Sequence, residues 1–396
     1  MSPTDQARVA IFCPTFLKPE MLHVYRQVAG LRIVAPVVLT FKRENADRFP
    51  FAPIRFVHRS PLRWLRRIWS VQLRKIPPQA YPDEVGSLKA LLSADRCQLL
   101  HIYFGNNGLF WLPFLRSCPT PSLVSFHGAD VQVNLSSRAA KRLFQELFAT
   151  CVLVLARSES LASDLVNLGC PAQKLRIQRT GIPLDTFRYY TRNRPTDGRW
   201  RLLQACRLIE KKGLPTTLRA FAAFLKRHPN ADLTIAGDGP LRSLLEKLAE
   251  DLQLEGKIKF TGFISQSALL TLYQESHFFL HPSEQTPDGN REGVPNSLLE
   301  AMATGLACIA TKHGGIPEAV THQESGILVP ESDFVDIEHW LERLATDDHL
   351  RESLGKHAAE TIKEKFDLTT QIKKLEEIYL SLRKHDSFGG FPQADR

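Results

Sequence analysis

Two glutamates separated by seven residues, Glu292 and Glu300, flank a stretch whose residue types suit recognition of an anion. The segment after Glu292 leads into the apolar run SLLEAMATG and comprises Gly293, Val294, Pro295 and Asn296. The first N–H groups of a helix have no partner within it and form a natural anion site. A plain capping box of Ser297 and Glu300 explains the second glutamate equally well.

Two cations precede this stretch, in ACRLIEKKG at 205–213. Arg207 and Lys212 follow a strand pattern and could converge on one diphosphate, although a solvated basic loop is the commoner origin of such a pair. IAGDGP at 235–240 adds a turn in which Gly237 lets the backbone approach a ligand or the next helix. In the first half, SFHGAD puts His127 just after a strand pattern, where a single histidine is usually structural.

The elements that would position these residues alternate between strands and helices. The first half has apolar strand patterns at 9–13, 33–40, 99–103, 122–126 and 152–155, with helical patterns at 20–29 and 137–148. The pattern restarts after a polar segment, with strands at 201–205, 232–236, 257–261, 277–281 and 307–311 and helices at 214–228, 241–252, 267–275 and 297–304. Such alternation predicts two doubly wound α/β domains with parallel sheets, facing each other across a cleft.

The predicted boundaries follow from this restart and from the chain length of 396 residues. We expect an N-terminal acceptor-binding domain over 1–190, a linker over 191–200 and a donor-binding domain over 201–366. A helix over 367–385 is expected to pack back toward the N-terminal domain, and a flexible tail to occupy 386–396.

Charge is distributed unevenly along the chain. Residues 1–196 hold 27 Lys+Arg against 12 Asp+Glu, and the remainder holds 24 against 30, within a net charge of +9. A cationic first half favours an anionic partner, such as a membrane surface, a phosphorylated acceptor or nucleic acid. Seven scattered cysteines without CxxC spacing, and an N-terminus without a leader pattern, favour a cytoplasmic protein with reduced thiols.

The segment SPLRWLRRIWSVQLRKIPP at 60–78 places its arginines on one face of a helix; they are Arg63, Arg66, Arg67 and Arg74. A core-packed helix with a solvated basic face is one interpretation. The other is an interfacial helix whose tryptophans settle among lipid headgroups while the arginines pair with anionic lipid.

From about 200 to 320 the chain resembles the retaining GT-B glycosyltransferases, the large family of group 1 enzymes that includes sucrose-phosphate synthases and mannosyltransferases. The resemblance is carried by the two spaced glutamates and, in order, by RLIEKKG, IAGDGPL, FTGFIS, HPS and ATKHGGIPEAV. It implies a metal-independent hexosyltransferase without a cofactor, acting on a UDP- or GDP-linked sugar. One departure is Cys206, where relatives usually carry glycine.

The resemblance also implies roles for individual residues. Arg207 and Lys212 would hold the pyrophosphate, Glu300 the ribose, and Glu292 the donor sugar. The backbone of Gly293–Asn296 would support the phosphate and sugar, and Phe263 would border the base. In the first half, His127 would face the donor sugar. The remaining acceptor or loop candidates, by likeness to polysaccharide-building members, are Glu20, Phe104, Gly105 and Asp130.

Two other classes remain open at this point. A nucleotide-sugar epimerase or another GT-B enzyme shares the architecture. A non-enzymatic basic module binding membrane or nucleic acid explains the charge of the first half, but it does not explain the order of the motifs in the second. The leading expectation is therefore sugar transfer to a saccharide or lipid-linked acceptor, with no nucleic-acid partner and with peripheral attachment to the membrane through the basic helix.

Overall fold

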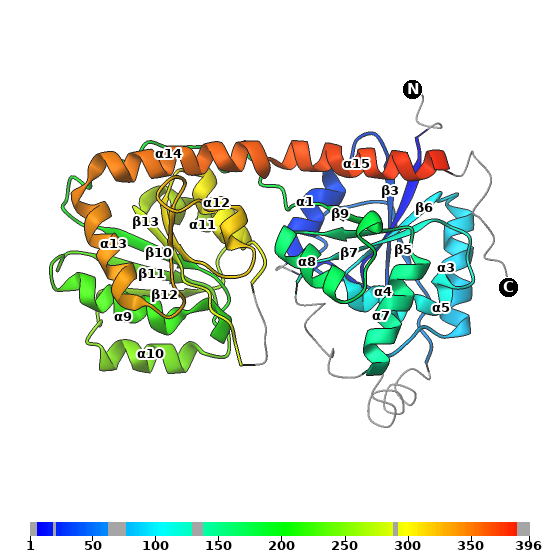
Figure 1. Cartoon of the computed structure of the whole chain (residues 1–396), viewed down its shortest axis with the longest axis horizontal. Coiled ribbons are helices and arrows are strands. Elements are labelled where there is room, and N and C mark those ends of the chain that lie inside the picture. The colour runs from blue at the N-terminus through cyan, green and yellow to red at the C-terminus, as the bar shows by residue number, and fades with distance from the viewer. Residues whose placement is uncertain (1–5, 19–20, 62–76, 129–137, 288–291, 386–396) are drawn as a thin grey trace. The chain divides into compact units, whose positions relative to one another are not determined.

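The computed structural model describes residues 6–18, 21–61, 77–128, 138–287 and 292–385. The chain forms two compact units (Figure 1). Unit 1 runs up to Gly181 and resumes at Leu368, and unit 2 is Ile182–Asp367. Each unit is built on one parallel sheet, so the predicted pair of doubly wound α/β folds is confirmed.

Unit 1 contains a seven-stranded sheet in the order β5-β3-β1-β6-β7-β8-β9, with a two-stranded pair β2-β4 beside it. Its elements are β1 (Arg8–Phe12), β2 (Thr15–Phe16), α1 (Leu22–Gly30), β3 (Ala35–Thr40), β4 (Lys42–Arg43), β5 (Ile54–Phe56), α3 (Pro82–Ala94), β6 (Leu99–Tyr103), α4 (Gly105–Phe110), α5 (Leu112–Leu115), β7 (Ser122–Phe126), α7 (Arg138–Thr150), β8 (Leu153–Ala156), α8 (Glu159–Asn167), β9 (Leu175–Ile177) and α15 (Leu368–His385).

Unit 2 contains a six-stranded sheet in the order β12-β11-β10-β13-β14-β15. Its elements are β10 (Arg201–Ala205), α9 (Leu214–Leu225), β11 (Asp232–Ala236), α10 (Arg242–Asp251), β12 (Ile258–Gly262), α11 (Gln266–Glu275), β13 (Phe278–His281), α12 (Asn296–Ala303), β14 (Ala307–Thr311), β15 (Ile327–Val329), α13 (Phe334–Thr346) and α14 (Asp348–Lys365).

Alternation along the strands explains why both faces of each sheet are covered. In β10, Leu202 joins one apolar cluster, which includes residues of α9 and α13, whereas Leu203 joins a second cluster with residues of α12 and α14. Successive side chains of a strand point to opposite faces, so a run of apolar residues can fill two cores at once. The strand order also reverses between β10 and β13, the position at which open α/β sheets form ligand crevices.

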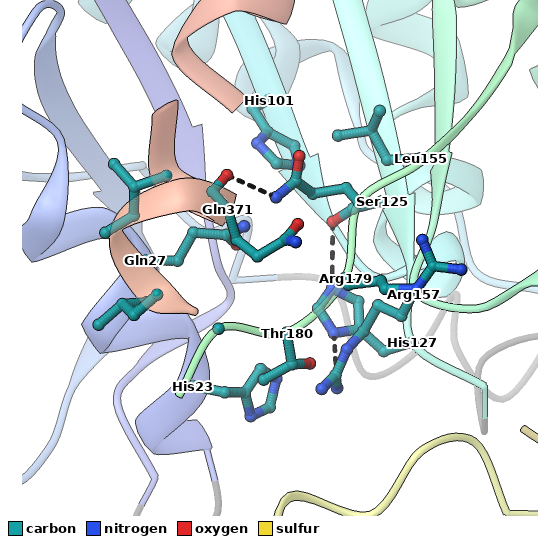
Figure 2. Close-up of a pocket in the computed structure, with 14 residues that line it drawn as sticks. His23, Gln27, His101, Ser125, His127, Leu155, Arg157, Arg179, Thr180 and Gln371 are labelled. Atoms are coloured by element: carbon teal, nitrogen blue, oxygen red, sulfur yellow. Dashed lines mark hydrogen bonds between the residues drawn. The ribbon is translucent and has the colours of Figure 1, made fainter. Parts of the chain in front are cut away.

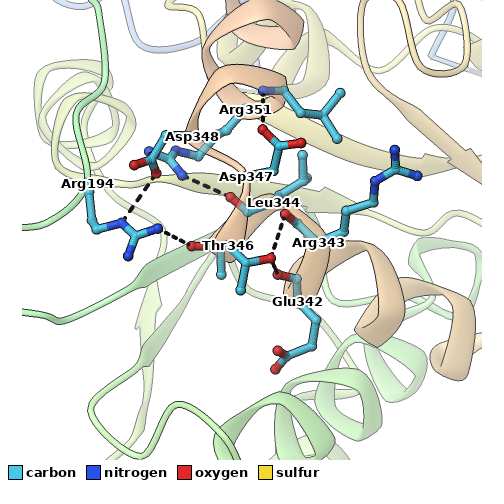
Figure 3. A network of polar contacts seen from close by, with 10 residues as sticks. Arg194, Glu342, Arg343, Leu344, Thr346, Asp347, Asp348 and Arg351 are labelled. Carbon is cyan, nitrogen blue, oxygen red and sulfur yellow. Dashed lines mark hydrogen bonds and ion pairs between the residues drawn. The ribbon is translucent and has the colours of Figure 1, made fainter.

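Arginines fasten the polar segment at 191–200 to unit 2. Arg192 is 9% exposed and donates to the carbonyl oxygens of Tyr273 (2.7 Å) and Ser276 (3.1 Å). Arg194 reaches Asp348 and the carbonyl of Ala345 where α13 meets α14 (Figure 3). The division between the units therefore falls at Gly181, ahead of the segment that the sequence suggested as a linker.

Helix α15 returns to unit 1, where it contacts α1 and β6. Its Glu376 is 3% exposed, and the Oε1 atom accepts hydrogen bonds from the backbone N–H groups of Arg32 (2.6 Å), Ile33 (2.5 Å) and Val34 (3.3 Å). These N–H groups follow the end of α1 and have no backbone acceptor among the described residues. One carboxylate therefore fixes the helix to the turn after α1.

We expect Glu376→Ala to lower the free energy of unfolding by about 2–3 kcal/mol, because it leaves buried N–H groups without an acceptor. Alanine favours helix, so the loss cannot come from helix propensity. Urea unfolding measures the change. Glu377→Ala, at the exposed neighbouring position, is the matched control, and equal losses in the two variants would contradict this account of α15.

Candidate donor and acceptor sites

Three loops of unit 2 meet through backbone contacts at the carboxyl ends of β10, β11 and β13. Gly213 has φ 59°, and a Cβ there would lie 1.7 Å from the carbonyl oxygen of Pro282. Gly237 has φ 142°, and its Cβ would lie 1.9 Å from the carbonyl oxygen of Cys206. Only glycine permits these approaches. Gly237 thus lets the backbone pack against the loop after β10, whereas the sequence suggested approach to a ligand or to the next helix.

Lys212 and Glu292 form an ion pair at this junction, with Lys212 Nζ donating to Glu292 Oε2. The lysine side chain is 10% exposed and the glutamate side chain 13%. Lys211 Nζ lies 3.9 Å from the same oxygen. The structure therefore brings together two residues that the sequence analysis predicted as parts of the site, Lys212 and Glu292, which are 80 positions apart. It also adds Lys211, which the sequence analysis did not single out.

The backbone of Glu292 is held by the loop after β14. Its N–H donates to His313 Nε2 (2.9 Å), so the ring proton lies on Nδ1, which donates to Glu331 (2.7 Å). A Cβ on Gly314, whose φ is 54°, would lie 1.9 Å from the Glu292 carbonyl oxygen. These contacts fix the backbone that carries the carboxylate, and they explain why glycine is needed in KHGGIP.

The charges around Glu292 set its protonation. Burial would raise the pKa of this carboxyl, but Lys212 and then Lys211 outweigh burial and lower it to about 2. His281, which is fully buried at the end of β13, has its pKa lowered to about 3, chiefly by burial and further by Lys212. At neutral pH Glu292 is therefore an ionised carboxylate and His281 a neutral imidazole.

Helix α12 carries Glu300 and begins one residue earlier than the sequence suggested. Its N-cap is Pro295, with no side-chain cap hydrogen bond, so Ser297 lies inside the helix and the capping box is not formed. Pro295 has no N–H and cannot be one of the expected backbone donors; its carbonyl accepts from Leu299 (3.1 Å). Glu300 is 7% exposed, and Tyr273 donates to its carboxylate (3.3 Å).

Other predicted residues of unit 2 lie outside the ion-pair cluster. Val294 packs against the loop at Gly315, while Gly293 has open space where a Cβ would stand. The Arg207 side chain is exposed, and its guanidinium has no hydrogen bond or ion pair with any residue that the structure describes. Phe263, just after β12, is 68% exposed. An exposed cation and an exposed ring are both available to a ligand.

In unit 1, His127 lies at the carboxyl end of β7 in a pocket (Figure 2). The guanidinium of Arg157 can only donate, and it lies 3.4 Å from His127 Nδ1; Nε2 therefore carries the proton and faces Ser125 Oγ at 3.1 Å. Burial, then Arg157 and His23, hold the pKa of His127 well below its ordinary value. The imidazole is neutral and held in one tautomer.

The rest of the pocket combines neutral polar side chains with Arg179 and three aliphatic residues, Leu155, Leu368 and Ile372. His101, deeper in the pocket, contacts the hydroxyl of Tyr379 (2.6 Å), and burial lowers its pKa to about 3. Other lining residues include Gln27, Gln178, Thr180 and Gln371. Such a lining suits the hydroxyl groups of a sugar better than an apolar ligand.

The remaining candidates of unit 1 have different positions. Phe104 has φ 71° and its ring lies 4.4 Å from that of His127, so it borders the pocket. Gly105 is buried, and a Cβ there would lie 2.1 Å from the ring of Phe126, which makes it a packing position. Glu20 and Asp130 lie outside the described residues, as do Arg63, Arg66, Arg67 and Arg74 of the basic segment.

Two family descriptions match the chain in succession: Glycosyltransferase Family 4 over residues 7–186 and Glycosyl transferases group 1 over residues 190–361. Residues 190–361 therefore belong to the group 1 glycosyltransferases, and residues 7–186 match a second glycosyltransferase family. The group 1 match agrees with the resemblance found in the sequence from about 200 to 320, and the Family 4 match extends the likeness to unit 1.

The chain is similar to curated glycosyltransferases named for amylovoran and colanic acid biosynthesis. The chain is 34% identical over 254 residues to the amylovoran biosynthesis glycosyltransferase AmsK of Erwinia amylovora, covering 64% of this chain and 61% of the relative. It is 33% identical over 208 residues to the putative colanic acid biosynthesis glycosyltransferase WcaL of Escherichia coli, covering 52% and 51%. The matched part thus spans about three fifths or less of these relatives.

Solved structures confirm the GT-B fold. Anabaena HepE, solved with UDP and glucose, has a TM-score of 0.74 at 16% identity, covering 95% of this chain and all of that one. A sucrose-phosphate synthase from Thermosynechococcus elongatus has a TM-score of 0.74 at 19% identity, covering 96% and 100%. Within the described part of the chain, no helix combines the length and apolar character needed to cross a bilayer.

Sequence reasoning missed Lys211, His313 and Glu331 as parts of the site. Lys211 and His313 stand inside the quoted motifs RLIEKKG and ATKHGGIPEAV, so their motif membership was a usable signal. Nothing in the sequence marks Glu331, which reaches the site only through the fold. His23 and Arg157 were missed in the same way around His127.

The lowered pKa of Glu292 predicts how the free energy of unfolding depends on pH. Because the folded value lies below the ordinary 4.5, the stability from the ionised carboxylate is complete above about pH 5 and is lost as pH falls toward 2. Glu292→Gln should therefore cost about 3 kcal/mol of unfolding free energy near neutral pH, as expected for breaking a buried ion pair. That cost should shrink as the pH falls from about 5 toward 2.

Urea titrations of both proteins at each pH measure this difference. Glu275→Gln, at an exposed position of α11, is the matched control. A cost that stays constant, or that grows as the pH falls, would mean that Glu292 is not held ionised by the lysines.

Proposed function

We propose that this protein transfers a hexose from a nucleoside diphosphate sugar to a saccharide or lipid-linked acceptor, with retention of anomeric configuration. The observation that carries the proposal is the buried pairing of Lys212 with Glu292 at the strand-order reversal of unit 2. It puts a cation suited to a diphosphate beside a carboxylate suited to sugar hydroxyls.

The chemistry follows from the charges. Transfer breaks the bond between the anomeric carbon and the diphosphate oxygen, and a new bond forms to an oxygen of the acceptor. Negative charge develops on the departing diphosphate and positive charge on the sugar. Fixed cations such as Lys212 and Arg207 stabilise the negative charge on the diphosphate, and loss of one such group commonly lowers the rate by about 10²–10³. The ionised Glu292 stabilises the positive charge on the sugar.

Each remaining donor residue receives a role within this proposal. Glu300, buried on α12, binds the ribose hydroxyls, and the exposed ring of Phe263 borders the base. The backbone at Gly293, Val294 and Asn296 approaches the phosphate and sugar. Because lysine and arginine neutralise the leaving group, we propose that the reaction proceeds without a metal or another cofactor. HepE was solved with UDP, so UDP is the first base to test, with GDP as the alternative.

His127 and its pocket, which Arg157 and Arg179 also line, form the proposed sugar-facing wall of unit 1. The two ring nitrogens of His127 face Ser125 Oγ and the Arg157 guanidinium, so the ring is held in one position against which a sugar can pack. Phe104, whose ring contacts that of His127, remains an acceptor candidate together with Glu20 and Asp130.

The relatives in amylovoran and colanic acid biosynthesis support a role in polysaccharide or glycolipid synthesis. A lipid-linked acceptor would lie at a membrane surface, so we propose a cytoplasmic enzyme held peripherally on the membrane by the basic segment.

Binding of nucleotides tests the donor site. A nucleoside diphosphate at a hundredfold excess over its Kd should stabilise the protein by about 3 kcal/mol, seen as a rise in Tm. Arg207→Ala and Glu300→Ala should reduce this rise, while Arg219→Ala, at an exposed position of α9, should not. If neither UDP, GDP nor their sugars raise the Tm of the wild type, the donor site is wrong. Product analysis with a nucleotide sugar then distinguishes transfer from epimerisation.

Co-sedimentation with anionic vesicles tests the membrane proposal. Replacing Arg63, Arg66 and Arg67 by alanine should release the protein, because each cation near an anionic surface contributes about 1 kcal/mol. The control replaces the exposed cations Arg138, Lys141 and Arg142 of α7. Equal binding of the wild type and the first variant would refute attachment through this segment.

A further inference from the structure

Two consecutive lysines share one carboxylate in unit 2. Lys212 donates to Glu292 Oε2, and the Lys211 ammonium lies 3.9 Å from the same oxygen. Their side chains are 10% and 8% exposed. Consecutive residues usually point in different directions, so this convergence requires a special local backbone.

A short 3-10 turn, Glu210–Lys212, provides that backbone, and two neighbours hold it. Glu284 N–H donates to the carbonyl of Lys211 (3.1 Å), and Gln204 Nε2 donates to the carbonyl of Lys212 (2.9 Å). Gly213 in the left-handed conformation then ends the turn against Pro282. Both ammonium groups are thereby directed to Glu292 by contacts independent of the ion pairs themselves.

Glu292 has two cations beside it, although one ion pair needs only one. Two cations and one carboxylate are buried together, where a carboxylate without a cation is strongly disfavoured. Within the proposed donor site, the incoming diphosphate attracts Lys212 away from Glu292. With a single lysine, this movement would leave Glu292 buried and unpaired. The free-energy cost of that unpaired carboxylate would weaken donor binding.

We propose that Lys211 is a positioning residue that keeps Glu292 paired and ionised while Lys212 moves from Glu292 to the diphosphate of the donor. The inference rests on the proposed function of this site. In it, Lys211 acts through Glu292: it keeps the carboxylate charged for the sugar, while His313 holds the Glu292 backbone, and it leaves Lys212 available to the phosphate.

A double-mutant cycle on nucleoside diphosphate affinity tests this role. Lys211→Met should raise the Kd for UDP or GDP about tenfold in the otherwise wild-type protein, within the range of couplings between contacting residues. In the Glu292→Gln background the same change should raise the Kd by no more than about twofold, because no buried carboxylate then needs a partner. Lys211→Arg should retain an affinity close to that of the wild type, since it keeps the charge.

Calorimetry on the full chain gives the Kd values, and unliganded melting curves show that each variant folds. Lys226→Met, at an exposed position at the end of α9, is the matched control and should leave the Kd unchanged. Equal losses in the two backgrounds, or no loss in either, would overturn the role of Lys211 while leaving the donor site in place. A wild type that binds no nucleoside diphosphate would instead refute the donor site and, with it, this role.

Discussion

The Glu292 carboxylate has to remain charged although protein surrounds it, and much of unit 2 is arranged to meet that condition. Lys212 and Lys211 provide the opposite charge, and His313 accepts the Glu292 N–H to fix its backbone. Such a group is stable only when cations and hydrogen bonds replace the water it has lost. The loops that carry these residues therefore have to meet closely, which explains the glycines at their contact points.

Topology decides where such a meeting can occur. The order β12-β11-β10-β13-β14-β15 reverses direction between β10 and β13, so the chain leaves these neighbouring strands toward opposite sides. The Lys212 loop follows β10, and the segment leading to Glu292 follows β13. Parallel strands end at the same edge of a sheet, so the two segments begin beside each other there.

Much of this could be predicted from the sequence. Strands β6, β7, β10, β11 and β14 have the predicted bounds, because apolar runs flanked by polar residues mark strands buried on both faces. The three-residue strands β5, β9 and β15 are too short to carry a recognisable pattern. The segment at 191–200 looked like a linker because it is polar, and only the buried contacts of Arg192 reveal that it belongs to unit 2.

The site was predictable where chemistry is encoded locally. The spacing of Glu292 and Glu300 and the order of the accompanying motifs are visible in the chain, whereas Glu331 joins through a contact with His313, 18 positions away. The capping-box alternative for Glu300 could be rejected only once α12 was seen to begin at Asn296. The sequence therefore identified the charged residues of the site, and the fold identified the residues that hold them in position.

A crystal structure of the protein with UDP or GDP bound tests the central claim most directly. The account predicts a phosphate oxygen within about 3 Å of Lys212 Nζ, with Glu292 now facing the sugar position and Lys211 beside it. A nucleotide bound elsewhere, with the Lys212–Glu292 pair intact, would contradict it.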